Sequence, residues 1–142
     1  SDLKEWADSL RETFRMMPWA PIAFVTAKTG RNVKAVIDTA QRLFRQSRTR
    51  VPTARLNAVL RDVVESNRPP SDARGRPVRL FYATQVEAAP PTIVISTSAP
   101  RSVTEPYKRY LLNAFRKSLP FTEVPIRLLV RGRSGDQSSP ET

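Results

Sequence analysis

The sequence contains no cysteine and no histidine, and it has only four glycines among its 142 residues. The lack of cysteine excludes a disulfide framework and a thiol nucleophile, and it is compatible with a cytoplasmic protein. The lack of histidine removes the side chain most used for proton transfer near neutral pH. Cysteine/histidine zinc sites and a Ser–His–Asp triad are excluded as well, so we expect neither catalytic residues nor a metal site in this chain.

Long apolar runs are also missing. The longest, residues 18–25, is much shorter than the about 20 residues that a membrane-spanning helix needs. The first residues do not combine a basic segment with an apolar stretch, so we expect no signal peptide and no membrane partner. The chain does not begin with Met, and we interpret it as a piece of a longer protein.

Positive charge and proline are in excess. The chain has 24 Lys and Arg against 13 Asp and Glu, a formal net charge of +11, and 13 prolines that break it into short elements. Hydrophobic residues make up 39%, which is enough for a packed core. The charge surplus is concentrated in residues 51–133, with 14 basic and 6 acidic residues. A surplus of this kind on a small domain is typical of proteins that bind polyanions.

The first 50 residues are predicted to form a helix, a strand and a second helix. Apolar residues recur at helical spacing over residues 2–15 and 32–47, and residues 22–26 form a short apolar run typical of a buried strand. This alternation belongs to α/β folds. Since a lone strand leaves its backbone groups unpaired, we interpret residues 1–50 as the remnant of an incomplete α/β domain.

After a basic linker at residues 45–52, the chain is predicted to form an α-β-β-α-β domain over residues 51–133, an α+β fold with a three-stranded sheet. The expected elements are a helix with Thr53 as its N-cap that ends before Pro69, strands at 78–86 and 92–97, a helix that starts near Pro106, and a strand at 126–130. Pro90 and Pro91 exclude a tight hairpin between the first two strands. Residues 134–142, rich in Gly, Ser and acids, are predicted to be a disordered tail.

The candidate polyanion-binding residues are basic side chains of the second domain. They are Arg74 and Arg76 in a loop, Lys108, Arg109 and Arg116 on a helix, and Arg127, Arg131 and Arg133 in and after the last strand. The helical residues fall within about 100° of one another, and the strand residues share a face by their period of two. The alternative is that these residues form ordinary solvated faces.

Aromatic residues of the same domain divide into core and candidate stacking residues. Tyr107 and Tyr110 lie on an apolar helical stripe and are predicted to be core residues, whereas either Phe81 or Tyr82 is free to stack on a base. A G-x-x-G sequence at residues 132–135 follows the last strand instead of joining two helices. We therefore do not expect it to clamp a nucleic-acid backbone as in KH domains.

Several segments carry a family resemblance. Thr26-Ala27-Lys28-Thr29-Gly30, between the first strand and helix, resembles the guanine-binding loop of P-loop GTPases, in which a small alanine lets the base approach a backbone N–H. Four further segments, which include Tyr82-Ala83-Thr84-Gln85-Val86 and Tyr107-Lys108-Arg109-Tyr110, resemble the C-terminal domain of the Der (EngA) GTPases; they are residues 53–70, 80–94, 106–112 and 125–131. The similarity extends over residues 2–133.

This resemblance implies that residues 1–50 are the end of a second GTPase domain and that residues 51–133 are a KH-like domain. Thr26, Ala27 and Lys28 would line the guanine pocket. The intact protein would bind GTP or GDP with Mg and hydrolyse GTP. This chain contains no P-loop and no Mg site, so we expect it to have no activity and no cofactor alone. The family acts in assembly of the large ribosomal subunit, which implies ribosomal RNA and the sister G domains as partners.

Three functional hypotheses follow. In the first, this part of a GTPase supplies the guanine loop and a basic RNA-binding or regulatory domain. In the second, it is a protein–protein module that docks on the sister G domains without contacting RNA. A stand-alone RNA-binding protein is disfavoured by the lone strand. An exposed apolar patch on the sheet would favour a protein partner, whereas a basic strip with one exposed aromatic would favour RNA.

Overall fold

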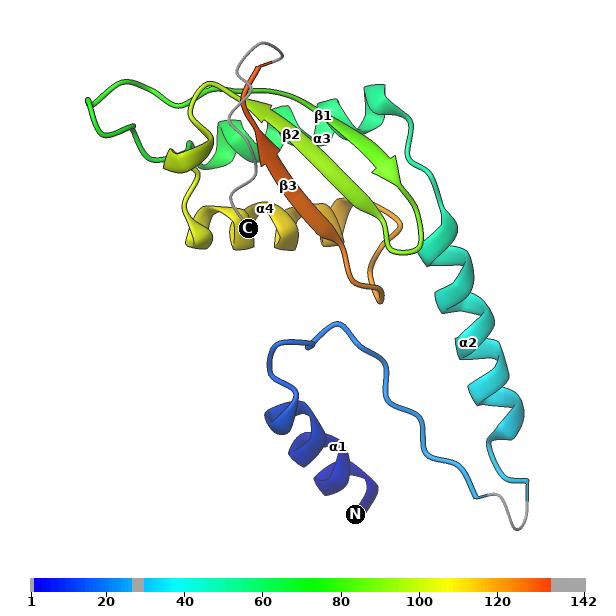
Figure 1. The fold of residues 1–142 in the computed structure, drawn as a ribbon. Coiled ribbons are helices and arrows are strands. Elements are labelled where there is room, and N and C mark those ends of the chain that lie inside the picture. The colour runs from blue at the N-terminus through cyan, green and yellow to red at the C-terminus, as the bar shows by residue number, and fades with distance from the viewer. Residues whose placement is uncertain (1, 27–29, 134–142) are drawn as a thin grey trace, which may run out of the picture.

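The computed structural model describes residues 2–26 and 30–133, so the predicted tail lies outside the described residues. Three helices come first, followed by two strands, a short 3-10 turn, a fourth helix and a third strand (Figure 1). Their bounds are α1 Asp2–Thr13, α2 Val33–Arg48, α3 Thr53–Ser66, β1 Leu80–Glu87, β2 Thr92–Thr97, η1 Pro100–Ser102, α4 Glu105–Ser118 and β3 Arg127–Arg131. From α3 onward this is the predicted α-β-β-α-β order.

The sheet is mixed and has the strand order β1-β2-β3. Strands β1 and β2 are antiparallel, with Ala83 opposite Ile95, and their connection at residues 88–91 is a loop, as Pro90 and Pro91 predicted. Strands β2 and β3 are parallel, with Ile95 opposite Val130. A parallel pair needs a crossover connection, and α4 supplies it.

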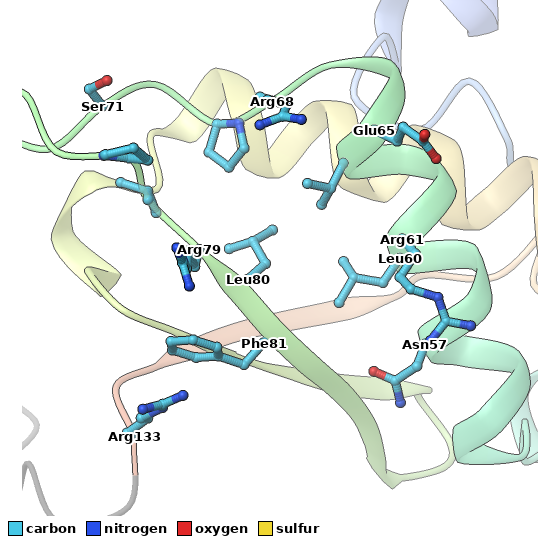
Figure 2. Close-up of a pocket in the computed structure, with 14 residues that line it drawn as sticks. Asn57, Leu60, Arg61, Glu65, Arg68, Ser71, Arg79, Leu80, Phe81 and Arg133 are labelled. Carbon is cyan, nitrogen blue, oxygen red and sulfur yellow. The ribbon is translucent and has the colours of Figure 1, made fainter.

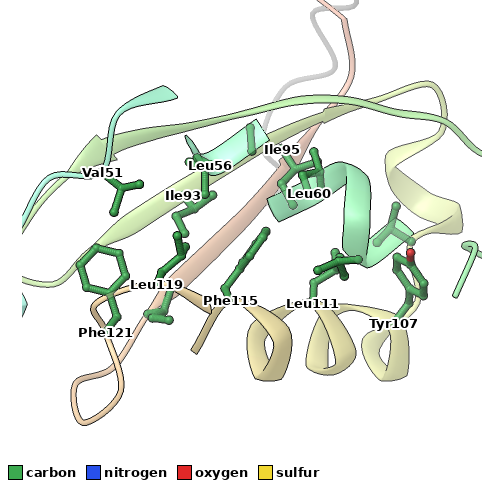
Figure 3. Close-up of a cluster of buried hydrophobic side chains, with 14 of the residues drawn as sticks. Val51, Leu56, Leu60, Ile93, Ile95, Tyr107, Leu111, Phe115, Leu119 and Phe121 are labelled. Atoms are coloured by element: carbon green, nitrogen blue, oxygen red, sulfur yellow. The ribbon is translucent and has the colours of Figure 1, made fainter. Parts of the chain in front are cut away.

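The hydrophobic core lies between one face of this sheet and helices α3 and α4 (Figure 3). Leu56 and Leu60 of α3, Ile93 and Ile95 of β2, and Leu111 and Phe115 of α4 are almost completely buried. The chain after α4 adds Phe121, which is also inaccessible to solvent. Tyr107 belongs to this core, and the partly buried Tyr110 packs against it, as the helical stripe predicted.

The two core helices begin differently. In α4 the Thr104 hydroxyl accepts a hydrogen bond from the Tyr107 N–H, and Pro106 lies in the first turn as predicted. In α3 the predicted N-cap is wrong, because Pro52 occupies the cap position and Thr53 is already helical. Since proline has no side-chain acceptor, α3 starts without a capping hydrogen bond.

The first 26 residues do not form the predicted strand. Residues 22–26 contain only one isolated bridge residue, Thr26, opposite Arg31. A strand requires a neighbour for its N–H and C=O groups, and the described part of the chain offers this segment none. Helix α1 has no buried residue. Large apolar side chains of this region remain exposed, including Leu3, Trp6, Phe14, Met16, Val25, Ile37 and Phe44.

The junction between α2 and α3 is shorter and more ordered than the predicted linker at residues 45–52. Helix α2 continues to Arg48, so only residues 49–52 connect the helices. The Gln85 side chain on β1 accepts from the Val51 N–H at 2.7 Å and donates to the Thr49 carbonyl oxygen at 3.0 Å. These hydrogen bonds tie the connection to the sheet.

Candidate nucleic-acid interface

The face of the sheet opposite the core carries two of the predicted arginines. Strand β3 packs Leu128 and Val130 against the core, so alternation places Arg127 and Arg131 on the other face, where both are exposed. Strand pairing sets Arg131 beside Ser96, and Ser96 beside Tyr82. Tyr82 is 49% exposed and is therefore the aromatic residue available for stacking on this face.

This outer face also has apolar character. Val86 is 45% exposed, and Leu129 on β3 and its neighbour Val94 on β2 are half-buried. The Ser96 hydroxyl is buried and forms no hydrogen bond with any described residue. The face thus combines a basic pair, an aromatic ring and apolar side chains.

Arg133, the third arginine of the predicted row, contacts an aromatic ring of β1. The Arg133 guanidinium lies over the Phe81 ring, 3.9 Å from the ring centroid. Phe81 sits where the β1–β2 register shifts, between Leu80 and Tyr82. Arg133 and Phe81 therefore form a stacked pair beside β1, which the period of two along β3 did not predict.

A groove of about 1030 Å³ lies beside this pair, between α3 and β1 (Figure 2). Its lining includes four arginines and one acidic residue: Arg61, Arg68, Arg79, Arg133 and Glu65. Leu60, Val64 and Leu80 supply apolar lining. Arg61, Arg68 and Arg79 were not predicted as site residues, because residues from α3 and from the segment around β1 come together only in the folded chain.

The loop before β1 holds Arg74 and Arg76 through one carboxylate. Asp72 accepts hydrogen bonds from the backbone N–H groups of Arg76 and Arg74, both at 2.9 Å, and from the Arg76 side chain at 3.0 Å. These contacts, led by the Arg76 N–H, lower the pKa of Asp72. The charge of Arg76 is thus paired, whereas Arg74 extends exposed from the loop.

The three basic residues predicted to share a face of α4 have different environments. Lys108 pairs with Glu105 at 3.2 Å, and Arg109 is exposed. Arg116 is half-buried, donates to the carbonyl oxygens of Phe121 and Val124, and lies 4.6 Å over the Trp19 ring. Burial lowers the pKa of the Arg116 guanidinium. Its Nη1 group holds the loop after α4 and the guanidinium is stacked on Trp19, so Arg116 is less accessible to a phosphate than the exposed Arg109.

Thr26 is the one described residue of the three assigned to the guanine loop, since Ala27 and Lys28 lie outside the described residues. Its N–H donates to the Arg31 carbonyl oxygen at 3.2 Å. Gly30 and Asn32 both have positive φ, at 68° and 66°, which allows the chain to turn into α2. The Asn32 side chain also donates to the Phe24 carbonyl oxygen at 3.0 Å. Thr26 is therefore bridged to Arg31, two residues before the start of α2.

A contact between α2 and the loop after α4 was not predicted. Arg42 donates to both Glu123 carboxylate oxygens at 2.7 and 2.9 Å, and Gln46 donates to one of them at 2.9 Å. The Glu123 N–H returns a hydrogen bond to Gln46 at 2.9 Å. The partners are about 80 residues apart in sequence, so no local pattern signals the pairing.

Within residues 2–26 and 30–133 no group of three or more carboxylate side chains is placed to hold a metal ion. No helix in the same ranges is long and apolar enough to cross a membrane.

The α-β-β-α-β order, the mixed sheet and the two helices on one face define an α+β domain of the KH-like type. A family model described as "KH-domain-like of EngA bacterial GTPase enzymes, C-terminal" matches residues 50–131, and the chain belongs to this family.

The chain is 45% identical over 138 residues to the GTPase Der of Rhodopirellula baltica, covering 97% of this chain and 30% of that protein. It is 42% identical over 130 residues to the GTPase Der of Myxococcus xanthus, covering 92% and 28%. The chain thus spans about three-tenths of the length of these relatives, and it aligns to their C-terminal part.

Proposed function

We propose that this chain is the C-terminal part of a Der-type GTPase that hydrolyses GTP and acts in the cytoplasm in assembly of the large ribosomal subunit. The proposal is supported by the similarity to two proteins named GTPase Der over more than nine-tenths of this chain. According to this proposal, residues 1–50 complete a G domain and residues 51–133 form the KH-like domain. Thr26, Ala27 and Lys28 then form one wall of the guanine pocket.

GTP or GDP and Mg are then cofactors of the intact protein, bound mainly by segments that precede this sequence. The chain contains no G-x-x-x-x-G-K-[ST] motif, so it has no loop to hold the nucleotide phosphates. We expect the 142-residue chain to show no GTP turnover and no heat of GTP binding in titration calorimetry. Micromolar binding would contradict this expectation.

The KH-like domain supplies an RNA-docking surface in this proposal. One observation carries it: the sheet face opposite the core presents exposed Arg127 and Arg131 beside the half-exposed side chain of Tyr82. Arginines bind phosphates, and an exposed ring stacks on an unpaired base. Arg74 in the loop before β1 and Arg109 on α4 are also exposed, but α4 packs on the other side of the sheet, so Arg109 does not belong to this face.

A second candidate is a protein-docking module that binds the sister G domains without contacting RNA. The apolar part of the same face favours it, since Val86 is 45% exposed and Leu129 is half-buried next to the arginines. A protein partner would cover these side chains.

Charge reversal on β3 distinguishes the two candidates. We expect Arg127→Glu with Arg131→Glu to weaken binding of ribosomal RNA by the chain and to reduce the slope of log affinity against log salt by about 1.4–1.8, because two phosphate contacts are lost. Lys4→Glu with Lys34→Glu, at exposed sites on α1 and α2, makes the same net-charge change and should alter the slope little. A slope equal to that of the unmodified chain would reject the RNA-docking face and leave the protein-docking candidate.

A further inference from the structure

The groove between α3 and β1 concentrates positive charge away from the outer sheet face. Arg61, Arg68, Arg79 and Arg133 line it against a single acidic residue, Glu65 (Figure 2). In residues 2–26 and 30–133 the four guanidinium groups form no ion pair with any carboxylate. An unneutralised arginine cluster around a hollow attracts a polyanion into that hollow.

The groove also contains a stacking surface. The carbon of the Arg133 guanidinium lies over the half-buried Phe81 ring, 3.9 Å from the ring centroid. Bases that are free of Watson–Crick pairing stack both on aromatic rings and on arginine planes. A stacked Arg–Phe pair therefore gives one base a planar, cationic platform next to the arginine cluster.

The edge of β1 in this groove is closed to an added strand. The Asn57 side chain of α3 donates to the Ala83 carbonyl oxygen at 3.0 Å and accepts from the Ala83 N–H at 2.8 Å. A peptide that extended the sheet at this point would have to displace both hydrogen bonds. This contact disfavours an extended peptide and leaves a ligand recognised through its phosphates and bases.

The volume is sufficient for such a ligand. About 1030 Å³ is at the upper end of the range of about 300–1,000 Å³ typical of ligand sites. Base-paired RNA keeps its bases stacked inside the helix, where they cannot reach the Arg133–Phe81 pair. The groove therefore fits a flexible single strand better than a duplex.

We propose that the groove between α3 and β1 binds a short single-stranded RNA segment. Arg61, Arg68 and Arg79 contact successive phosphates, and one base stacks on the Arg133–Phe81 pair. The inference rests on the proposed RNA-binding function and gives it a second, separate contact site.

The test is fluorescence anisotropy of the full 142-residue chain with a labelled single-stranded RNA of ten nucleotides and mixed sequence. We expect Arg68→Glu with Arg79→Glu to weaken binding about tenfold or more and to reduce its salt dependence. Lys4→Glu with Lys34→Glu is the charge-matched control and should weaken binding much less. Both groove arginines are exposed, and a thermal melt by circular dichroism verifies that each variant is folded.

The stacking part has its own matched pair of variants. Phe81→Ala should weaken binding about fivefold or more. Phe44→Ala removes a similar pair on α2, where Arg48 lies 4.6 Å over the Phe44 ring, and should leave binding unchanged. Equal affinities of these two variants would overturn the stacking role of Phe81.

Other outcomes separate the groove from the proposed function. If the unmodified chain binds no RNA, both the docking function and the groove inference fail. If Arg127→Glu with Arg131→Glu abolishes binding while Arg68→Glu with Arg79→Glu does not, the docking function stands and the groove inference is overturned. Competition experiments give a further test. If duplex RNA or oligoglutamate of equal charge displaces the probe with the same efficiency as single-stranded RNA, the groove inference is also overturned. Photocrosslinks from 4-thiouridine to peptides of α3 and β1 would support it without any substitution.

Discussion

At the scale of single residues, two tyrosine hydroxyls fasten α4 to the last turn of α3. Tyr107 donates to the Asn67 carbonyl oxygen at 2.7 Å, and Tyr110 donates to the Val63 carbonyl oxygen at 2.6 Å. The Asn67 carbonyl group follows the last helical residue and has no partner within the helix, whereas the Val63 carbonyl oxygen also accepts from the Asn67 N–H. The two rings, 5.4 Å apart, thus fill the core with their carbons and satisfy the end of α3 with their hydroxyls.

Removing these hydroxyls should lower stability. We expect Tyr107→Phe to reduce the free energy of unfolding by about 1–2 kcal/mol and Tyr110→Phe by less, because Val63 also accepts from the Asn67 N–H. Urea denaturation measures both changes. Tyr82→Phe is the control: its half-exposed hydroxyl makes no hydrogen bond with a described residue, so the change should stay within about 0.5 kcal/mol. Equal losses in all three variants would contradict the capping role.

The Tyr107 hydroxyl also predicts a loss of stability at alkaline pH. Burial raises the pKa of Tyr107 from 10.0 to about 12. Because the folded pKa is above the unfolded one, the contribution is fully present below pH 10 and declines as the pH rises to about 12. In urea titrations between pH 9 and 12, Tyr107→Phe should lose stability less steeply than the unmodified chain. Parallel curves would show that other groups control the alkaline loss.

At the scale of elements, helix α2 is held to the KH-like domain by Glu123. The hydrogen bonds from Arg42 and Gln46 lower the pKa of Glu123, with the Arg42 side chain as the largest cause. The same pairing raises the pKa of Arg42. Leu43 packs against the core, and the Ala89 N–H donates to the Ser47 carbonyl oxygen at 2.7 Å. The C-terminal half of α2 is therefore part of the folded unit.

Glu123→Gln should loosen this attachment without unfolding the domain. We expect faster hydrogen exchange of the amides in the C-terminal half of α2 at pH 7, and little change in β2. The folded pKa of Glu123 lies below 4.5, so the effect should be constant above about pH 4.5 and vanish as the pH falls through that lower pKa. Glu87→Gln, at an exposed end of β1, is the control. Unchanged exchange in α2 would mean that Leu43 packing and the Ala89–Ser47 hydrogen bond hold the helix without Glu123.

The elements differ in how far the sequence predicted them. The helices and strands of the KH-like domain were predicted to within a few residues, because apolar spacing and proline act locally. The strand at 22–26 was wrong because a strand depends on a neighbour that the described chain does not supply. The helical wheel grouped Arg116 with Lys108 and Arg109, but the loop after α4 folds back over Arg116. The groove arginines and the Glu123 contact depend on residues distant in sequence, which periodicity does not reveal.

At the scale of the whole molecule, apolar burial is uneven along the chain. Every fully or nearly fully buried hydrophobic residue of the described ranges lies between Val51 and Ile126. Helix α1 buries nothing, and the exposed face of α2 includes Ile37 and Phe44. Helix formation in short segments depends on packing of an apolar face, so α1 has little to stabilise it in this chain. In the proposed function, the remainder of a G domain would cover these apolar faces.

This asymmetry predicts a gradient in native-state hydrogen exchange of the 142-residue chain. Amides of β2, α3 and α4 should open only with global unfolding, because their side chains form the core. The C-terminal half of α2 should be protected to an intermediate degree by Glu123, Leu43 and Gln85, whereas α1 should exchange almost as fast as an unfolded peptide. Mass spectrometry of peptic peptides measures all three classes in one experiment. Protection of α1 equal to that of β2 would contradict the prediction, because it would require α1 to be stabilised by contacts that this structure does not contain.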